Sequence, residues 1–170
     1  MEIGIRPITN SDLADCGRIC YDAFRLVNER HGFPAFPSIE AGMGRVQGML
    51  EAPSTHGIVA EADGNVVGFA FLTERDPVRS IGPIAIDPGV QSHGIGRRLM
   101  GALLKRARGA SSIRLVQAGY NLHSMSLYAT LGFDAKEQLI VIRTATATRA
   151  GWLFGSASRR NGLIGMRSAA

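Results

Sequence analysis

A glycine-containing segment in the middle of the chain is the clearest candidate for binding an anion. It runs from a strand-like stretch into a helix-like one and reads Ile84-Ala85-Ile86-Asp87-Pro88-Gly89-Val90-Gln91-Ser92-His93-Gly94-Ile95-Gly96-Arg97-Arg98. Gly94 and Gly96 allow the backbone to approach a ligand closely. The first amides of the following helix have no carbonyl partners, so they can donate to phosphate oxygens while the helix dipole assists. The sequence therefore predicts a phosphate-binding loop.

Two common phosphate motifs do not fit this loop. A Walker loop requires Lys and then Ser or Thr after its second glycine, whereas Ile95 and Gly96 follow Gly94. A dinucleotide-binding loop requires a third Gly or Ala where Leu99 stands, and an acidic residue about twenty positions later, where Arg114 and its neighbours occur. The pattern that remains is Gln, two residues, Gly, one residue and Gly.

A second motif lies further along the chain. Asn121 follows a buried strand-like stretch, Tyr128 comes seven residues later on a short helix, and Leu131-Gly132-Phe133 ends that helix. Structural roles account for part of this motif, because glycine favours the left-handed residue that ends a helix and Phe133 is a core candidate. Tyr128 is either a packed aromatic residue or a proton donor.

In this order and on these elements, the two motifs resemble those of the GNAT superfamily of acetyl-CoA-dependent N-acetyltransferases. That family combines a loop of Arg or Gln, two residues, Gly, one residue and Gly or Ala with a later Asn, a Tyr seven residues on, and Leu-Gly-Phe. Gln91, Gly94 and Gly96 fit the loop. The resemblance spans residues 3–142 and implies an α/β fold in which helices flank both faces of a mixed sheet with splayed strands.

The resemblance also implies a reaction and a set of site residues. Acetyl-CoA is the implied co-substrate, with no metal, and its acetyl group moves to a primary amine of a small molecule or peptide by direct attack in a ternary complex. Tyr128 would protonate the departing CoA sulfur, and Asn121 would bond the pantetheine arm. The backbone of Ile84, Ala85 and Ile86 would pair with pantetheine. The implied pyrophosphate site consists of Gln91 and the backbone amides of Ser92, His93, Gly94, Ile95, Gly96 and Arg97.

The general base is not assigned. Many relatives place a Glu on the strand before the loop, but residues 81–86 contain no carboxylate, and Pro83 removes an amide donor from that strand. Glu61, Glu74 and Asp76 either act through water or are solvated surface charges.

A second function class therefore stays open. His93 and His123 flank the two motifs and are interpreted as exposed spacers rather than bases. The missing base favours a CoA-binding module without turnover, a degenerate GNAT domain with a sensing or interaction role. The presence of both Asn121 and Tyr128 opposes that alternative.

The implied acceptor site lies between the first two helices and the splayed strands. The loop over residues 28–37 contains Phe33 and Phe36 beside charged residues. These aromatic side chains either line a pocket for an apolar amine or hold the loop against the core. Small amines, amino acids, antibiotics and protein N-termini all stay open as acceptors.

The candidate residues require strands and helices that hold them together. Apolar alternation and β-branched runs predict strands over residues 3–8, 57–62, 66–73, 80–86, 113–118 and 138–142. Three- and four-residue apolar spacing predicts helices from the Thr9–Asp12 capping box to Val27, and over 38–51, 94–108 and 124–131. A turn at 63–65 joins two of the strands as a hairpin, while the second half implies a parallel crossover.

The charge distribution argues against a nucleic-acid partner. The net charge is +5, but residues 1–142 contain fourteen basic and fourteen acidic residues. The whole excess comes from five arginines in the last twenty-eight residues, Arg143, Arg149, Arg159, Arg160 and Arg167. A basic face on the body of the protein is therefore not expected.

The remaining features concern domains, location and assembly. We expect one GNAT domain over 1–142 and a basic, low-complexity extension over 143–170, with a strand candidate near 151–155. A sheet edge left open by a missing closing strand could pair with a second chain, so a homodimer is expected. The chain contains no long apolar run or signal-like start, which predicts a cytoplasmic protein without a membrane partner. Cys16 and Cys20 are predicted to be core thiols rather than metal ligands or a disulfide.

Overall fold

The computed structural model describes residues 2–34, 36–140 and 162–168, which form seven strands and four α-helices. The strands are β1 (Ile3–Pro7), β2 (Thr55–Ala62), β3 (Asn65–Thr73), β4 (Val78–Ile86), β5 (Ser112–Ala118), β6 (Phe133–Ile140) and β7 (Gly162–Ser168). The helices are α1 (Leu13–Glu29), α2 (Ile39–Glu51), α3 (Ile95–Arg106) and α4 (Leu122–Thr130), and 3-10 turns occupy Asn10–Asp12 and Pro88–Val90.

All seven strands belong to one mixed sheet, in the order β1-β2-β3-β4-β5-β7-β6. Neighbouring strands are antiparallel except for β4 and β5, which are parallel. The parallel pair follows from the crossover through α3, because a strand that returns in the same direction needs a long connection. Asp63 and Gly64 take positive φ values of 50° and 79° and close the hairpin between β2 and β3. The mixed α/β sheet confirms the predicted fold class.

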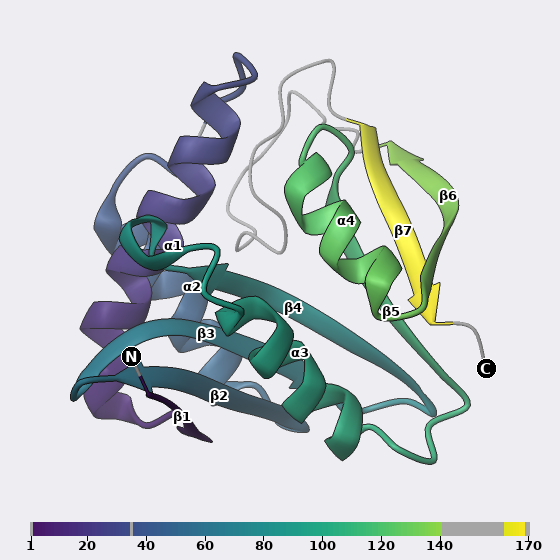
Figure 1. Ribbon diagram of the computed structural model, residues 1–170, viewed down its shortest axis with the longest axis horizontal. Coiled ribbons are helices and arrows are strands. Elements are labelled where there is room, and N and C mark those ends of the chain that lie inside the picture. The colour runs from purple at the N-terminus through teal and green to yellow at the C-terminus, as the bar shows by residue number, and fades with distance from the viewer. Residues whose placement is uncertain (1, 35, 141–161, 169–170) are drawn as a thin grey trace, which may run out of the picture.

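Helices cover both faces of the sheet, as the resemblance implied. On one face, α1 and α2 pack on β3 through fully buried residues that include Cys16, Ile19, Cys20, Val46, Phe69 and Phe71. On the other face, α3 and α4 pack through a second cluster that includes Leu99, Met100, Leu103, Tyr128 and Phe133. In Figure 1, α3 crosses in front of β2 and β3.

The sheet opens between β4 and β5. Their parallel pairing ends at Ile81 and Leu115. Beyond that pair, β4 continues along β3 as far as Ile86, and β5 continues along β7 as far as Ala118. Figure 1 shows the group of β5, β6 and β7 turned away from β1 to β4. The splayed strands that the family resemblance implies are therefore β4 and β5. Each of them has one edge that faces the opening.

The C-terminal part of the sheet differs from the predicted strands. The strand expected over 138–142 begins earlier, at Phe133, because Gly132 takes a φ of 84°, ends α4, and turns the chain directly into β6. The strand candidate near 151–155 lies outside the described residues. The strand that pairs with both β5 and β6 is instead Gly162–Ser168. The closing strand whose absence would have favoured a dimer is therefore present as β7.

Candidate functional site

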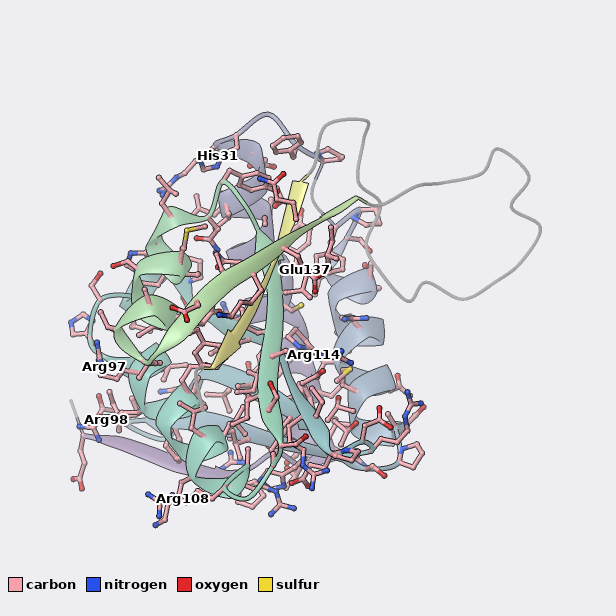
Figure 2. All side chains as sticks on the ribbon, turned by 90° about the vertical axis from the view of Figure 1, so that its right-hand side faces the viewer. His31, Arg97, Arg98, Arg108, Arg114 and Glu137 are labelled. Carbon is pink, nitrogen blue, oxygen red and sulfur yellow. The ribbon has the colours of Figure 1, made fainter. Side chains whose placement is uncertain are left out.

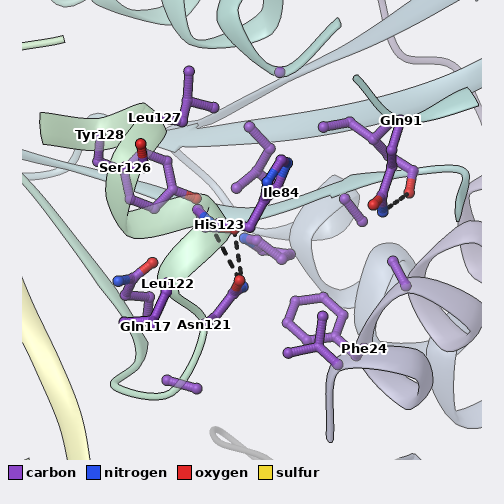
Figure 3. Close-up of a pocket in the computed structure, with 18 of the residues that line it drawn as sticks. Phe24, Ile84, Gln91, Gln117, Asn121, Leu122, His123, Ser126, Leu127 and Tyr128 are labelled. Atoms are coloured by element: carbon purple, nitrogen blue, oxygen red, sulfur yellow. Dashed lines mark hydrogen bonds between the residues drawn. The ribbon is translucent and has the colours of Figure 1, made fainter. Parts of the chain in front are cut away.

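A cleft of about 750 Å³ occupies the opening between β4 and β5. Its walls are the second half of β4, the loop before α3, the end of β5, α4, and the last turns of α1. Figure 3 shows Gln117, Asn121 and Tyr128 on one side of it, with Gln91 and Phe24 on the other. Apart from His93, all the predicted catalytic and cofactor-binding residues line this cleft.

The loop before α3 is held in shape by its own side chains. The Asp87 Oδ1 atom accepts a hydrogen bond from the Gly89 backbone amide at 2.9 Å, and Gln91 Nε2 donates to the Ile86 carbonyl at 3.4 Å. Ser92 and Gly94 both take left-handed φ values, of 72° and 76°. These two turns aim the start of α3 at the cleft.

Gly94 and Gly96 are required for different structural reasons. A Cβ atom on Gly94 would meet nothing within 4 Å, so its positive φ and the open space beside it both suit a closely approaching ligand. A Cβ atom on Gly96 would come within 3.0 Å of Ile86 Cδ1 and 3.1 Å of Leu127 Cδ2. Gly96 therefore allows α3 to approach β4 and α4, a packing role that leaves its backbone amide in the first turn of α3.

The N-terminus of α3 offers unpaired amides. No side chain caps this helix, and its first-turn N–H groups have no carbonyl partner within the helix. The Arg97 guanidinium donates to Thr130 Oγ1 at 2.8 Å, which ties α3 to α4 and leaves the Arg97 backbone amide at the helix start. His93 Nδ1 lies 3.0 Å from the Gln91 carbonyl, so its ring folds back on the loop. The arrangement is suited to an anion held by backbone amides.

Asn121 acts as the N-cap of α4. Its Oδ1 accepts a hydrogen bond from the Ser124 amide at 3.3 Å, and its Nδ2 donates to Ser124 Oγ at 2.9 Å. Asn is a favoured residue at this position because its oxygen satisfies an otherwise free helix amide. One N–H of its carboxamide is still available to the cleft, which it lines.

Tyr128 is a buried phenol in the wall of the cleft. The residue is 5% exposed, and its ring packs on Phe133 with a centroid distance of 6.2 Å. Burial raises the pKa of Tyr128 to about 12, while a hydrogen bond with Ser124 acts in the opposite direction. The side chain is therefore protonated throughout the neutral and mildly alkaline range.

An aromatic stack joins α1 to the loop after β5. The rings of His31 and Phe33 stack on Tyr120, with centroid distances of 4.8 and 4.6 Å, and the Tyr120 hydroxyl donates to Asn28 Oδ1 at 2.8 Å. Phe36 instead packs edge-on against Phe24. Sequence analysis had not singled out Tyr120, although an aromatic residue directly before the motif Asn was a signal for it.

The lining of the cleft carries no carboxylate among the described residues. Its ionisable side chains include Arg30, His31, Arg97 and His123. Residues 141–161, which lie outside the described part, contain neither Asp nor Glu in their sequence. His31 and Arg97 lie well apart along the molecule (Figure 2).

The carboxylates considered as bases lie elsewhere and in ion pairs. Glu61 pairs with Arg6 at 2.8 Å, and Glu74 pairs with Arg106 at 2.8 Å. Asp76 lies 3.8 Å from the neighbouring Arg75. None of the three lines the cleft, which leaves the base unassigned.

Gln117 is a lining residue that the sequence analysis missed. It lies on β5, is 8% exposed, and neither Nε2 nor Oε1 has a hydrogen-bond partner within the described structure. No sequence signal distinguishes it, because a lone Gln in a strand is ordinary. Within the same described residues, no group of three potential metal ligands occurs, and no helix is long and apolar enough to cross a membrane.

Comparison with known proteins points to one family. The model described as acetyltransferase (GNAT) family matches residues 21–133. The N-alpha-acetyltransferase RimI of Mycobacterium tuberculosis is 35% identical over 89 residues, which cover 50% of this chain and 56% of that protein. The chain therefore matches little more than half the length of this curated relative.

Solved structures share the whole fold. A ribosomal-protein-alanine N-acetyltransferase from Brucella melitensis has a TM-score of 0.70 at 22% identity, covering 98% of this chain and 99% of that one. The paia N-acetyltransferase from Thermoplasma acidophilum in complex with coenzyme A has a TM-score of 0.71 at 17% identity, and both chains are covered completely, at 100%. These similarities confirm the fold.

Proposed function

The chain belongs to the acetyltransferase (GNAT) family, and on that basis we propose that it transfers an acetyl group from acetyl-CoA to a primary amine in a ternary complex. The observation that carries this proposal is the cleft between β4 and β5. Backbone amides of α3 stand at one end of the cleft, and the Tyr128 phenol lies in its wall. Acetyl-CoA, when bound, supplies the thioester whose acetyl group is transferred.

The loop and β4 would hold the co-substrate. First-turn amides from Ile95 to Arg97, with the Gly94 turn, suit the pyrophosphate because they present N–H groups without adding side-chain bulk. The free edge of β4 at Ile84, Ala85 and Ile86 could hydrogen-bond to the amides of the pantetheine arm, as it would to an added strand. The open N–H of Asn121 would donate to the same arm.

Tyr128 would act as the general acid. As the amine nitrogen bonds to the acetyl carbon and the carbon–sulfur bond breaks, Tyr128 donates its proton to the sulfur and the amine proton passes to water. A free thiol has a pKa near 8.5, below the value of about 12 that burial gives Tyr128. Burial raises a thiol pKa too, since the core thiols of Cys16 and Cys20 reach about 12. A CoA sulfur buried in the same way would hold a proton more tightly than a free thiol does.

The lack of Asp and Glu in the described lining supports an acceptor with a weakly basic amine. Without a carboxylate base in the described lining, the amine has only water, His31 or His123 to take its proton, or must already be neutral. An α-amino group, with a pKa of about 7.7–8.0, is partly neutral at physiological pH, whereas a lysine-type amine near 10.4 is almost fully charged. We therefore favour the N-terminal amine of a peptide, and the name of the Mycobacterium tuberculosis relative, N-alpha-acetyltransferase, is consistent with it.

A matched pair of peptides tests the proposal. One has a free N-terminal alanine and an internal lysine, and the other has the same sequence with a blocked N-terminus. Incubation with acetyl-CoA should release free CoA thiol with the first peptide and little with the second, and mass spectrometry should locate the acetyl group on the N-terminal amine. Faster modification of the blocked peptide would reject the α-amine acceptor.

A CoA-binding module without turnover is the second candidate, favoured by the lack of a carboxylate among the described lining residues. The same experiment separates the two functions. Acetyl-CoA that raises the melting temperature without thiol release, across peptides and small amines, would support the silent module. An absence of any melting shift would contradict both.

A further inference from the structure

The Gln117 carboxamide is an anomaly in an otherwise satisfied interior. Its residue is 8% exposed, and both Nε2 and Oε1 are buried without a partner among the described residues. Buried polar side chains are nearly always hydrogen-bonded, because a desolvated group that loses its water partners destabilises the fold. A carboxamide left in this state inside a cleft wall needs a reason beyond packing.

The backbone of Gln117 is fixed by strand pairing. Gln117 follows Leu115, the last β5 residue paired with β4, by two positions, so both side chains point to the same face of the sheet. Across the other edge of β5, Gln117 pairs with Ile164 of β7. Gln117 thus stands at the start of the opening, on the same side of the cleft as Asn121 and Tyr128 (Figure 3).

The opposite wall of the cleft is formed by β4. On β4, the residues directly after the last paired residue, Ile81, are Gly82 and Pro83, and both line the cleft. Because the Asp87 N–H donates to the Val67 carbonyl of β3 at 2.9 Å, alternation along β4 turns the N–H groups of Ile84 and Ile86 towards the opening.

We propose that the Gln117 carboxamide binds an amide of the pantetheine arm of acetyl-CoA from β5, across the cleft from the free edge of β4. The inference rests on the proposed function, since it requires CoA in the cleft. The pantetheine arm contains two secondary amides, each with one N–H and one carbonyl, and a primary carboxamide can donate to the carbonyl and accept from the N–H. Gln117 lines the opening in which these amides would lie.

Substitution by leucine tests the proposal. If Gln117 serves to bind CoA, the substitution should raise the melting temperature and weaken CoA binding. If Gln117 serves the structure, the substitution should lower the melting temperature. Gln117→Leu keeps a similar volume and removes both unpartnered polar atoms. The melting temperature of the protein without ligand should therefore rise by a few degrees. The dissociation constant of CoA should rise about tenfold, since the variant loses the hydrogen bonds to pantetheine.

The probe that controls for the rest of the site is adenosine 3′,5′-bisphosphate, which lacks the pantetheine arm. Its affinity should be equal in the wild type and in Gln117→Leu. Gln117→Met should behave like the leucine variant. Gln138→Leu, at an exposed position on β6, should change neither the affinity for CoA nor the affinity for the bisphosphate.

Each alternative result is decisive. Unchanged CoA affinity in Gln117→Leu and Gln117→Met, or an equal loss of affinity for CoA and the bisphosphate, would overturn the pantetheine contact. A lower melting temperature in both variants would assign Gln117 to the structure instead. If the wild type binds the bisphosphate but not CoA, or binds neither, the proposed function itself fails, and this outcome is distinct from the others.

Discussion

Tyr128 combines a central position in the cleft with a strongly held proton. Replacing it by Phe removes the hydroxyl while the ring still packs on Phe133. We expect kcat to fall by about 10²- to 10⁴-fold, the usual contribution of a general acid, with the dissociation constant of acetyl-CoA nearly unchanged. Steady-state kinetics and calorimetry on Tyr128→Phe measure the two quantities.

Tyr120 provides the matched control for that experiment. Tyr120 also lines the cleft, but its hydroxyl already donates to Asn28 Oδ1 at 2.8 Å. Tyr120→Phe should change kcat much less than Tyr128→Phe does. Because the raised pKa keeps Tyr128 protonated, the wild-type rate should not decline between about pH 7 and 10 through loss of this proton. Equal rates in wild type and Tyr128→Phe would remove Tyr128 from the mechanism.

Asp12 makes the stability of the N-terminal region depend on pH. Its two oxygens accept hydrogen bonds from the Arg6 guanidinium at 2.8 Å, and Oδ2 also accepts from the Thr9 amide. These bonds, Arg6 first, lower the pKa of Asp12 from 3.8 to about 2. A depressed pKa means that the ionised form stabilises the fold above about pH 4, and that this stabilisation is lost as the pH falls towards 2.

The Asp12→Asn variant measures this contribution. We expect a loss of about 1–2 kcal/mol in the free energy of unfolding at pH 7, less than the full shift implies because the Arg6 side chain is 39% exposed. Near pH 2 the two proteins should differ much less. Denaturant unfolding at both pH values tests this, and a difference that is the same at pH 2 and pH 7 would contradict it.

At the scale of elements, the loop before α3 depends on Gly94. Alanine at this position must adopt a φ near 76°, which costs about 1–2 kcal/mol for a residue with a Cβ atom. The added methyl also projects into the open space beside the helix start. Gly94→Ala should therefore lower both the stability and the affinity for acetyl-CoA.

Gly101 is the control for Gly94, because it lies in the exposed interior of the same helix with nothing within 4 Å of a built Cβ. Gly101→Ala should raise the stability by up to about 1 kcal/mol, through helix propensity, and leave binding unchanged. Thermal melts with and without acetyl-CoA compare the two variants. The anion-binding interpretation of the loop fails if Gly94→Ala binds acetyl-CoA as the wild type does.

Most elements could be predicted from the sequence because local signals agree with tertiary packing. The turn at Asp63 and Gly64, and the apolar spacing of α1 and α3, required no knowledge of distant contacts. β7 could not be predicted in this way. Gly162–Ser168 contains two glycines, and its pairing with β5 and β6 depends on strands far away in the sequence.

In the candidate site, too, some features could be predicted from local sequence and others depend on distant contacts. The two motifs located the loop and the Asn121 and Tyr128 side chains, since residue type and spacing carry that information. The packing role of Gly96 and the unpartnered amide of Gln117 depend on neighbours from other elements, Leu127 among them. The expected metal-free chemistry and dimer stay predictions.

For the whole molecule, β7 connects the C-terminal residues to the strand that forms one wall of the cleft. It lies between β5 and β6 and is hydrogen-bonded to both. A chain truncated after residue 161 loses this strand, which leaves an unpaired edge on β5 beside Gln117 and on β6. Exposed edges of this kind pair with other chains.

We therefore expect the 1–161 truncation to melt at a lower temperature, to bind acetyl-CoA more weakly, and to self-associate in light scattering. Removal of residues 169–170 alone, which follow β7, should change none of these properties. Adding back a synthetic peptide of residues 160–170 should restore part of the melting temperature and reduce the association, because it can reoccupy the position between β5 and β6. A 1–161 chain that is as stable and as monomeric as the full chain would show that β5 and β6 hold the cleft wall without β7.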